Sequence, residues 1–169
     1  MEPFDSGELK LDLNETGTVA PGTNGVHHPP EADRLAARRA DVDAKQEQVA
    51  RLLEETGCEG ALLLMPAHVS WFTAGMNVRG LIADGERPGV FTNGRQRWLL
   101  GSNADTQRLF DEELDRLGFQ LKEWVWDGGR ADLLMSVTGG KKIAADRPFP
   151  NTQQLAERLR PLVRVLSPA

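Results

Sequence analysis

Apolar side chains recur at helical spacing between residues 31 and 56, and charged side chains cover the opposite side of the repeat. Two prolines stand just before this segment, and Gly57 follows it as a C-terminal stop. The pattern predicts one long amphipathic helix. Its apolar side consists of Leu35, Val42, Val49, Leu52 and Leu53.

Short apolar runs downstream of Gly57 predict strands. Gly60–Met65 is bounded by glycine and proline and is too short for a helix, which favours a buried strand. Two further runs flank Asn93–Gly94, and an Asn-Gly pair predicts a hairpin because both residues tolerate positive φ. The other expected strands are 119–126, 141–146 and 164–166.

Helical segments alternate with these strands. We expect a short helix or turn at 67–73, a helix from Ser102 or Asn103 through Leu117, a short helix near 131–137, and a last helix that Asn151 or Thr152 caps. The alternation predicts an α/β fold, with a mixed sheet of about five or six strands and flanking helices, in one domain spanning 31–169. Residues 1–30 are rich in turn residues and poor in large apolar ones, so we expect a flexible N-terminal tail.

Composition narrows the classes of function. The formal net charge of the 169-residue chain is -5, which argues against a sequence-independent grip on nucleic acid. The N-terminus has neither a basic start nor a long apolar run, and no segment is apolar enough to span a membrane. We therefore expect a cytoplasmic protein with no nucleic-acid or membrane partner. The single cysteine, Cys58, excludes an internal disulfide.

Candidate catalytic residues are few. His27 and His28 lie in the expected tail, and no carboxylate stands three or four residues from His68 on a helix face, so a packed turn histidine is favoured over a metal ligand. Cys58 and His68 form the available thiol–imidazole pair, but Cys58 follows a helix C-terminus, where the helix dipole disfavours a thiolate. We expect no catalytic residue and no metal ligand in this chain; a Cys58-dependent enzyme is the alternative.

The stretch from Trp71 to Gly80 is the least ordinary part of the chain, because an aromatic, apolar segment ends in an amide and a guanidinium. Trp71, Asn77 and Arg79 are the candidate contacts to a substrate or partner, since the planar fork of Arg79 can grip a carboxylate. For Trp71 the favoured interpretation is still a core residue, and for Arg79 it is a solvated loop cation.

The order of these features resembles the N-terminal domain of the creatinase, prolidase and aminopeptidase P family, the pita-bread metallohydrolases. Residues 56–64 are similar to the family's glycine followed by an aliphatic strand, and Pro66–Gly75 is similar to its proline followed by Asn-Ile-x-Tyr-Leu-Thr-Gly. The hairpin at 93–94 matches the family's strand, Asp-Gly, strand element. The segments 123–128 and 142–146 lie where the family has similar strand and loop sequences. The resemblance covers about residues 34 to 167. The chain departs from the family at three positions. Trp71 stands where Tyr is usual, His68 stands where Asn is usual, and Ala74 is an insertion before Gly75.

This resemblance implies an α/β fold related in topology to ribonuclease H. In the family, two metal ions (Mn, Co or Zn) are bound by Asp, Asp, His, Glu and Glu of a separate C-terminal catalytic domain, which is expected to begin after Ala169. The N-terminal domain helps to form a homodimer and overhangs the neighbouring active site. The resemblance thus implies the non-catalytic N-terminal domain of an Xaa-Pro aminopeptidase/dipeptidase-like or creatinase-like hydrolase. A stand-alone interaction module with the same fold is the alternative.

Overall fold

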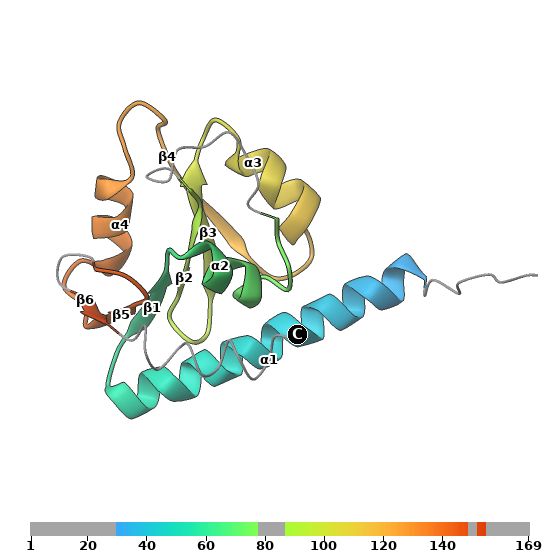
Figure 1. Cartoon of the computed structure of the whole chain (residues 1–169), viewed down its shortest axis with the longest axis horizontal. Helices are drawn as coiled ribbons and strands as arrows, with labels where there is room; N and C mark the ends of the chain where they lie inside the picture. Colours follow the sequence, from blue (N-terminus) through green and yellow to red (C-terminus); the bar gives the residue numbers. More distant parts are fainter. Residues whose placement is uncertain (1–29, 78–86, 149–151, 155–169) are drawn as a thin grey trace, which may run out of the picture.

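A computed structural model of the chain describes residues 30–77, 87–148 and 152–154. In chain order the elements are α1 (Glu31–Thr56), β1 (Gly60–Leu63), α2 (Pro66–Phe72), β2 (Gly89–Thr92), β3 (Arg97–Ser102), α3 (Thr106–Leu109), the π-helical turn η2 (Phe110–Leu114), β4 (Gln120–Trp124), α4 (Ala131–Thr138), β5 (Ile143–Ala145) and β6 (Thr152–Gln154). Figure 1 shows their arrangement. None of the described helices is both long and apolar enough to cross a membrane.

The six strands form one sheet in the order β4-β3-β2-β1-β5-β6. β2 is antiparallel to both of its neighbours, and all other pairs are parallel. Every strand except β2 therefore points the same way, so their carboxyl ends share one edge of the sheet. This mixed sheet with helices confirms the predicted fold class.

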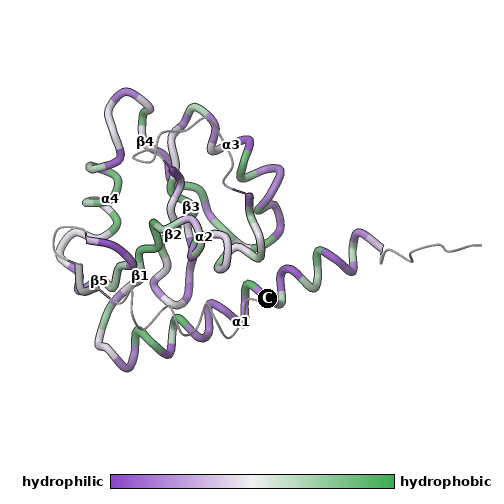
Figure 2. Tube along the Cα trace, in the orientation of Figure 1, coloured by the Kyte–Doolittle hydropathy of each residue, from purple (hydrophilic) through white to green (hydrophobic). Residues whose placement is uncertain are grey.

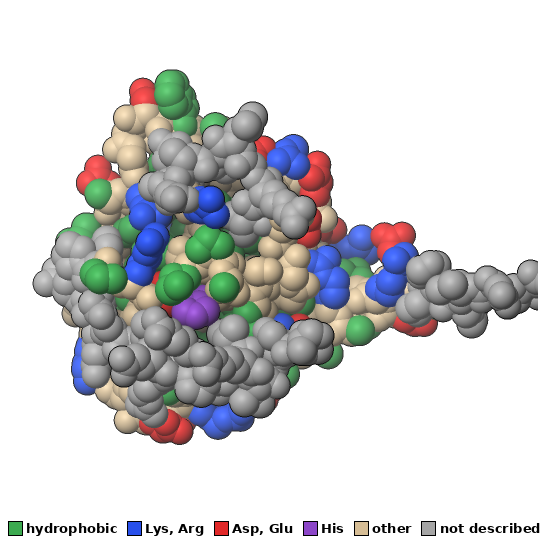
Figure 3. Space-filling model, in the orientation of Figure 1, with side chains coloured by type: hydrophobic (Ala, Val, Ile, Leu, Met, Phe, Trp, Pro, Cys, Tyr) green, Lys and Arg blue, Asp and Glu red, His purple; other side chains and the backbone are tan. Residues whose placement is uncertain are grey.

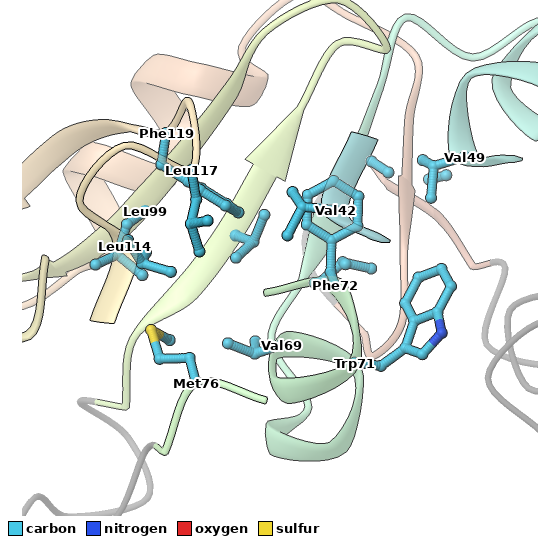
Figure 4. Packing of buried hydrophobic residues seen from close by; sticks show 14 of the residues in the cluster. Val42, Val49, Val69, Trp71, Phe72, Met76, Leu99, Leu114, Leu117 and Phe119 are labelled. Atoms are coloured by element: carbon cyan, nitrogen blue, oxygen red, sulfur yellow. The ribbon is translucent and has the colours of Figure 1, made fainter. Parts of the chain in front are cut away.

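Helices cover both faces of the sheet, and each face has its own apolar cluster. Ala61 and Leu63 of β1 belong to the cluster under α1, α2 and α3, whereas Leu62 and Leu64 belong to the cluster under α4. Successive side chains of a strand point to opposite faces, so β1 is buried on both. We call these clusters the α1-side cluster and the α4-side cluster; Figure 4 shows part of the first.

Helix α1 is longer than the sheet it covers. Between Glu31 and Asp41 no side chain is fully buried, and complete burial begins at Val42. Figure 1 shows this first part of α1 extending past the rest of the fold, and Figure 2 shows hydrophilic and hydrophobic residues alternating along the helix. The predicted stop is confirmed, since Gly57 adopts φ 62 and Cys58 N donates to Leu53 O over 2.9 Å.

The predicted hairpin exists, but its turn differs from the expected geometry. The strands pair Thr92 with Arg97, so four residues connect them. Gly94 has φ +84, whereas Asn93 is not among the residues with positive φ. Asn93 instead accepts hydrogen bonds from the backbone N–H groups of Arg95 and Gln96 through Oδ1, at 3.0 and 2.7 Å. A side-chain acceptor therefore stabilises the turn where we expected a left-handed residue.

Two helix boundaries were predicted wrongly. Ser102 does not cap a helix; it ends β3, because the parallel pairing with Trp124 keeps it in the sheet, and α3 starts only at Thr106. Thr152 lies in β6, paired with Ile143, and does not cap a helix. In both cases strand pairing outweighs the preference of Ser and Thr for helix caps. The predicted tail up to residue 29, the helix expected near 155–162 and the strand at 164–166 lie outside the described residues.

Candidate functional site

The carboxyl edge of the sheet holds a fully buried carboxylate. Asp146 directly follows β5, and its side chain is 0% exposed. It accepts hydrogen bonds from Leu64 N (2.9 and 3.0 Å to the two oxygens) and from Met65 N (2.8 Å). These two N–H groups lie at the end of β1, just before α2. Because β1 and β5 are parallel neighbours, their ends meet, and Asp146 ties β5 to the start of α2.

His68 completes this arrangement from the first turn of α2. Its Nδ1 lies 2.9 Å from Asp146 Oδ2, and the ring is 4% exposed. A carboxylate oxygen accepts, so the Nδ1–H group of His68 donates this hydrogen bond. Enzymes orient a general base with the same carboxylate–imidazole contact. Within the described segments, no hydrogen bond joins a hydroxyl or thiol to His68.

The packed histidine expected from the sequence is therefore found, but its partner was not foreseen. Asp146 stands 78 residues from His68 in the chain, so no local spacing connects them. Only the parallel pairing of β1 with β5 brings them together. Across residues 30–77, 87–148 and 152–154, no three His, Cys, Asp or Glu side chains gather in a way that could hold a metal ion.

Trp71, a candidate contact residue, lies in the core. Its side chain is 5% exposed in the α1-side cluster, with the ring 6.1 Å from that of Phe72. Lys45 Nζ stands 5.6 Å from the indole centroid, a cation–π contact. Figure 4 shows the indole extending from α2 on the side where Val49 lies. The indole N–H is buried without an acceptor. The structure thus agrees with the favoured interpretation of Trp71 as a core residue.

The other two candidate contacts do not join Trp71 in a described site. Asn77 is exposed after α2, at the end of a described segment. Arg79 lies outside the described residues. A contact between these residues and a substrate or partner stays a prediction. Cys58 is 8% exposed, and its Sγ lies 4.0 Å from Thr56 O.

A buried arginine that the sequence analysis did not single out joins α1 to the sheet. Arg97 in β3 is 4% exposed and donates to Asp43 Oδ1 (2.6 Å), to Gln46 Oε1 (3.1 Å) and to Leu117 O. Its guanidinium carbon lies 5.2 Å from the centroid of the Phe119 ring. Burial, only partly offset by Asp43, holds the pKa of Arg97 below its usual range. In the sequence, the position of the charged Arg97 beside the apolar residues of a predicted strand could have indicated a buried ion pair.

Comparison with known proteins finds relatives by structure alone: no protein-family model and no curated protein matches the chain. A creatinase/prolidase N-terminal domain of an X-Pro dipeptidase from Streptococcus pyogenes superposes with a TM-score of 0.52 at 16% identity, covering 70% of this chain and 98% of that one. A domain of a dipeptidase from Streptococcus thermophilus gives 0.54 at 14%, covering 70% and 97%.

A proline dipeptidase structure from Streptococcus pneumoniae also gives a TM-score of 0.54 at 14% identity, covering 73% of this chain and 98% of that one. At such identities the likeness is one of fold. The predicted order of helices and strands and these superpositions agree with each other. The chain therefore has the fold of the creatinase/prolidase N-terminal domain.

Proposed function

We propose that this chain is the non-catalytic N-terminal domain of a metal-dependent Xaa-Pro aminopeptidase/dipeptidase-like or creatinase-like hydrolase of the cytoplasm. In this proposal it contributes to a homodimer and covers a neighbouring active site. The fold supports the family, because the chain covers 97–98% of three solved structures, two described as domains of dipeptidases and one as a proline dipeptidase.

The observation that carries the non-catalytic role is the way the chain uses its buried histidine and aspartate. Both oxygens of Asp146 are engaged by backbone N–H groups, and one of them also by His68 Nδ1. These hydrogen bonds hold the ends of β1 and β5 against the first turn of α2, so the role of the His68–Asp146 pair in this proposal is structural.

A dinuclear Mn, Co or Zn centre would supply an activated water for peptide hydrolysis. The described residues of this chain do not fit such a centre, since no group of three suitable ligands exists among them and Asp146 is already surrounded by donors. In this proposal the metal ions belong to a C-terminal catalytic domain, the expected partner of this one.

Calorimetric titration of the purified chain with MnCl2, CoCl2 and ZnCl2, beside an assay with Xaa-Pro dipeptides, tests the proposal. We expect no stoichiometric metal binding and no hydrolysis, and light scattering should give about twice the 18.6 kDa mass of one chain. Tight stoichiometric metal binding would refute the non-catalytic role.

The coding sequence downstream separates this proposal from its alternative. A continuation into a domain with Asp, Asp, His, Glu and Glu ligands supports the hydrolase. A stop codon directly after Ala169 supports a stand-alone interaction module with the same fold.

A further inference from the structure

The turn between β2 and β3 places the backbone nitrogen of Gly94 next to the side-chain amide of Asn93 in the chain. Asn93 is exposed, so water reaches this amide. The amide carbon, Cγ, and the nitrogen of Gly94 can close a five-membered ring, because only Cβ, Cα and the backbone carbonyl carbon of Asn93 stand between them. An intramolecular attack gains from this proximity, and glycine has no side chain to hinder its own nitrogen.

Two backbone N–H groups hold the amide oxygen of Asn93. Arg95 N donates to Oδ1 over 3.0 Å, and Gln96 N donates to the same oxygen over 2.7 Å. Because both neighbours are donors, the oxygen end of the amide must face them. Donors about 2.7–3.1 Å from an oxygen that becomes negatively charged stabilise this charge, as in an oxyanion hole. The turn therefore offers two such donors to the oxygen that becomes anionic when Cγ is attacked.

The attacking nitrogen has an acceptor of its own. Gly94 N donates to Oγ1 of Thr92 over 3.0 Å, and this hydroxyl donates to Gln96 O over 2.8 Å. Thr92 is 0% exposed, so its hydroxyl is held in place. An acceptor that draws the proton from an attacking N–H group makes the nitrogen more nucleophilic. The Thr92 hydroxyl thus lies where the proton of Gly94 N has to leave.

A second exposed asparagine, Asn103, has only part of this arrangement. Ala104 N donates to the hydroxyl of Ser102 over 3.3 Å, which repeats the contact of Gly94 N with a hydroxyl. However, Asn103 Oδ1 accepts from one backbone N–H group, that of Trp126 at 3.1 Å. The following residue is alanine, whose Cβ crowds the attacking nitrogen. Asn103 is therefore a matched comparison within the same chain.

We propose that Asn93–Gly94 is a self-modification site, at which Asn93 loses ammonia and becomes aspartate or isoaspartate. Gly94 N bonds to Asn93 Cγ and gives its proton to water, the Cγ–Nδ2 bond breaks, and Nδ2 leaves as ammonia with a proton from water. Water then opens the cyclic imide. Cleavage at Cγ gives aspartate, and cleavage at the backbone carbonyl carbon gives isoaspartate. The site does not depend on the hydrolase function, so either proposal can fail alone.

The two products differ in their effect on the hairpin. Aspartate keeps acceptor oxygens for the two N–H groups that now bind Oδ1. Isoaspartate lengthens the main chain by one methylene group, at a turn that lies against α1: a Cβ on Gly94 would be 3.3 Å from Ala50 Cβ. We therefore expect isoaspartate to loosen the contact of the hairpin with α1.

Both products carry a carboxylate, which makes the formal net charge of -5 one unit more negative. Figure 3 shows basic (blue) and acidic (red) side chains interspersed on the viewed face. Ion exchange therefore separates the converted chain by its net charge, without one dominant patch.

Incubation of the whole chain in mildly alkaline buffer tests the site. Anion exchange isolates the acidic forms, and tryptic mapping with mass spectrometry assigns each form to its asparagine. Mapping also distinguishes Asn93 from Asn24, which belongs to a second Asn-Gly pair outside the described residues. We expect Asn93 to convert at least tenfold faster than Asn103, because one further donor to the developing oxyanion lowers the barrier by that much or more.

Thr92→Val removes the hydroxyl acceptor and should slow the conversion of Asn93 several-fold. Thr138→Val is the matched control, because Thr138 is also buried and its hydroxyl donates to a backbone carbonyl, Leu134 O, at 2.7 Å. Far-UV circular dichroism shows whether each variant is folded, and the wild-type chain in guanidinium chloride gives the rate without the turn.

Conversion in the folded chain at a rate within about tenfold of the unfolded one, with this variant pattern, supports the site. The proposal is overturned if Asn93 stays intact in the folded chain while it converts in guanidinium chloride. It is also overturned if Asn103 converts as fast as Asn93, or if Thr138→Val slows the conversion as much as Thr92→Val does.

Discussion

The most informative perturbation is the removal of the buried carboxylate at the carboxyl edge. Asp146→Ala withdraws the acceptor from Leu64 N, Met65 N and His68 Nδ1, which lie 2.8–3.0 Å from its oxygens. A buried donor left without an acceptor costs about 1–3 kcal/mol. For three donors we expect a loss of roughly 3–6 kcal/mol in the free energy of unfolding, since water entering the gap recovers part of the cost.

That loss is comparable to the whole stability of a domain of this size, about 5–15 kcal/mol. Asp146→Asn keeps one carbonyl acceptor at the same place and should cost less, roughly 2–3 kcal/mol. Urea unfolding followed by tryptophan fluorescence measures both. Asp127→Ala is the matched control, because Asp127 is exposed in the loop before α4 and its removal should change stability by less than about 0.5 kcal/mol.

A double-mutant cycle with His68→Ala isolates the imidazole contact. We expect a coupling energy of about 0.5–3 kcal/mol between His68 and Asp146, because the two side chains share one buried hydrogen bond. If Asp146→Ala lowers the stability by less than about 1 kcal/mol, the view that this carboxylate fastens β5 to α2 is wrong.

Three further predictions concern α1 and the centre of the sheet. Arg97→Met should lower the free energy of unfolding by about 2–4 kcal/mol, because it strands the acceptors that the guanidinium now contacts; urea midpoints measure this. Burial opposes ionisation of Asp43, yet the hydrogen bond and charge of Arg97 hold the pKa of Asp43 below its usual value of about 3.9. Its contribution is therefore present above that value and is lost as the pH falls through the lower folded pKa, so Asp43→Asn should flatten the loss of stability measured between about pH 5 and pH 3. Gly60→Ala should cost about 1–3 kcal/mol, because its Cβ would lie 2.8 Å from the Phe91 ring, whereas Gly128→Ala meets only ordinary contacts and should be neutral in the same assay.

Periodicity along the chain was sufficient for the elements that bury a continuous apolar stripe or run. The helix from Glu31 is recognisable because its buried residues recur about every 3.6 positions. The strand at Gly60 is recognisable because its apolar residues are consecutive. Boundaries that depend on a partner strand were not recognisable. Ser102 and Thr152 have the side chains of helix caps, but pairing with β4 and β5 places them in strands.

The sequence by itself therefore determined the fold class and the course of the first half of the domain. Contacts between residues far apart in the chain were decided only by the tertiary structure. His68 and Asp146 meet because two parallel strands end at one edge of the sheet. Local repeats report which side of an element is buried, whereas strand order and direction decide which charges become neighbours.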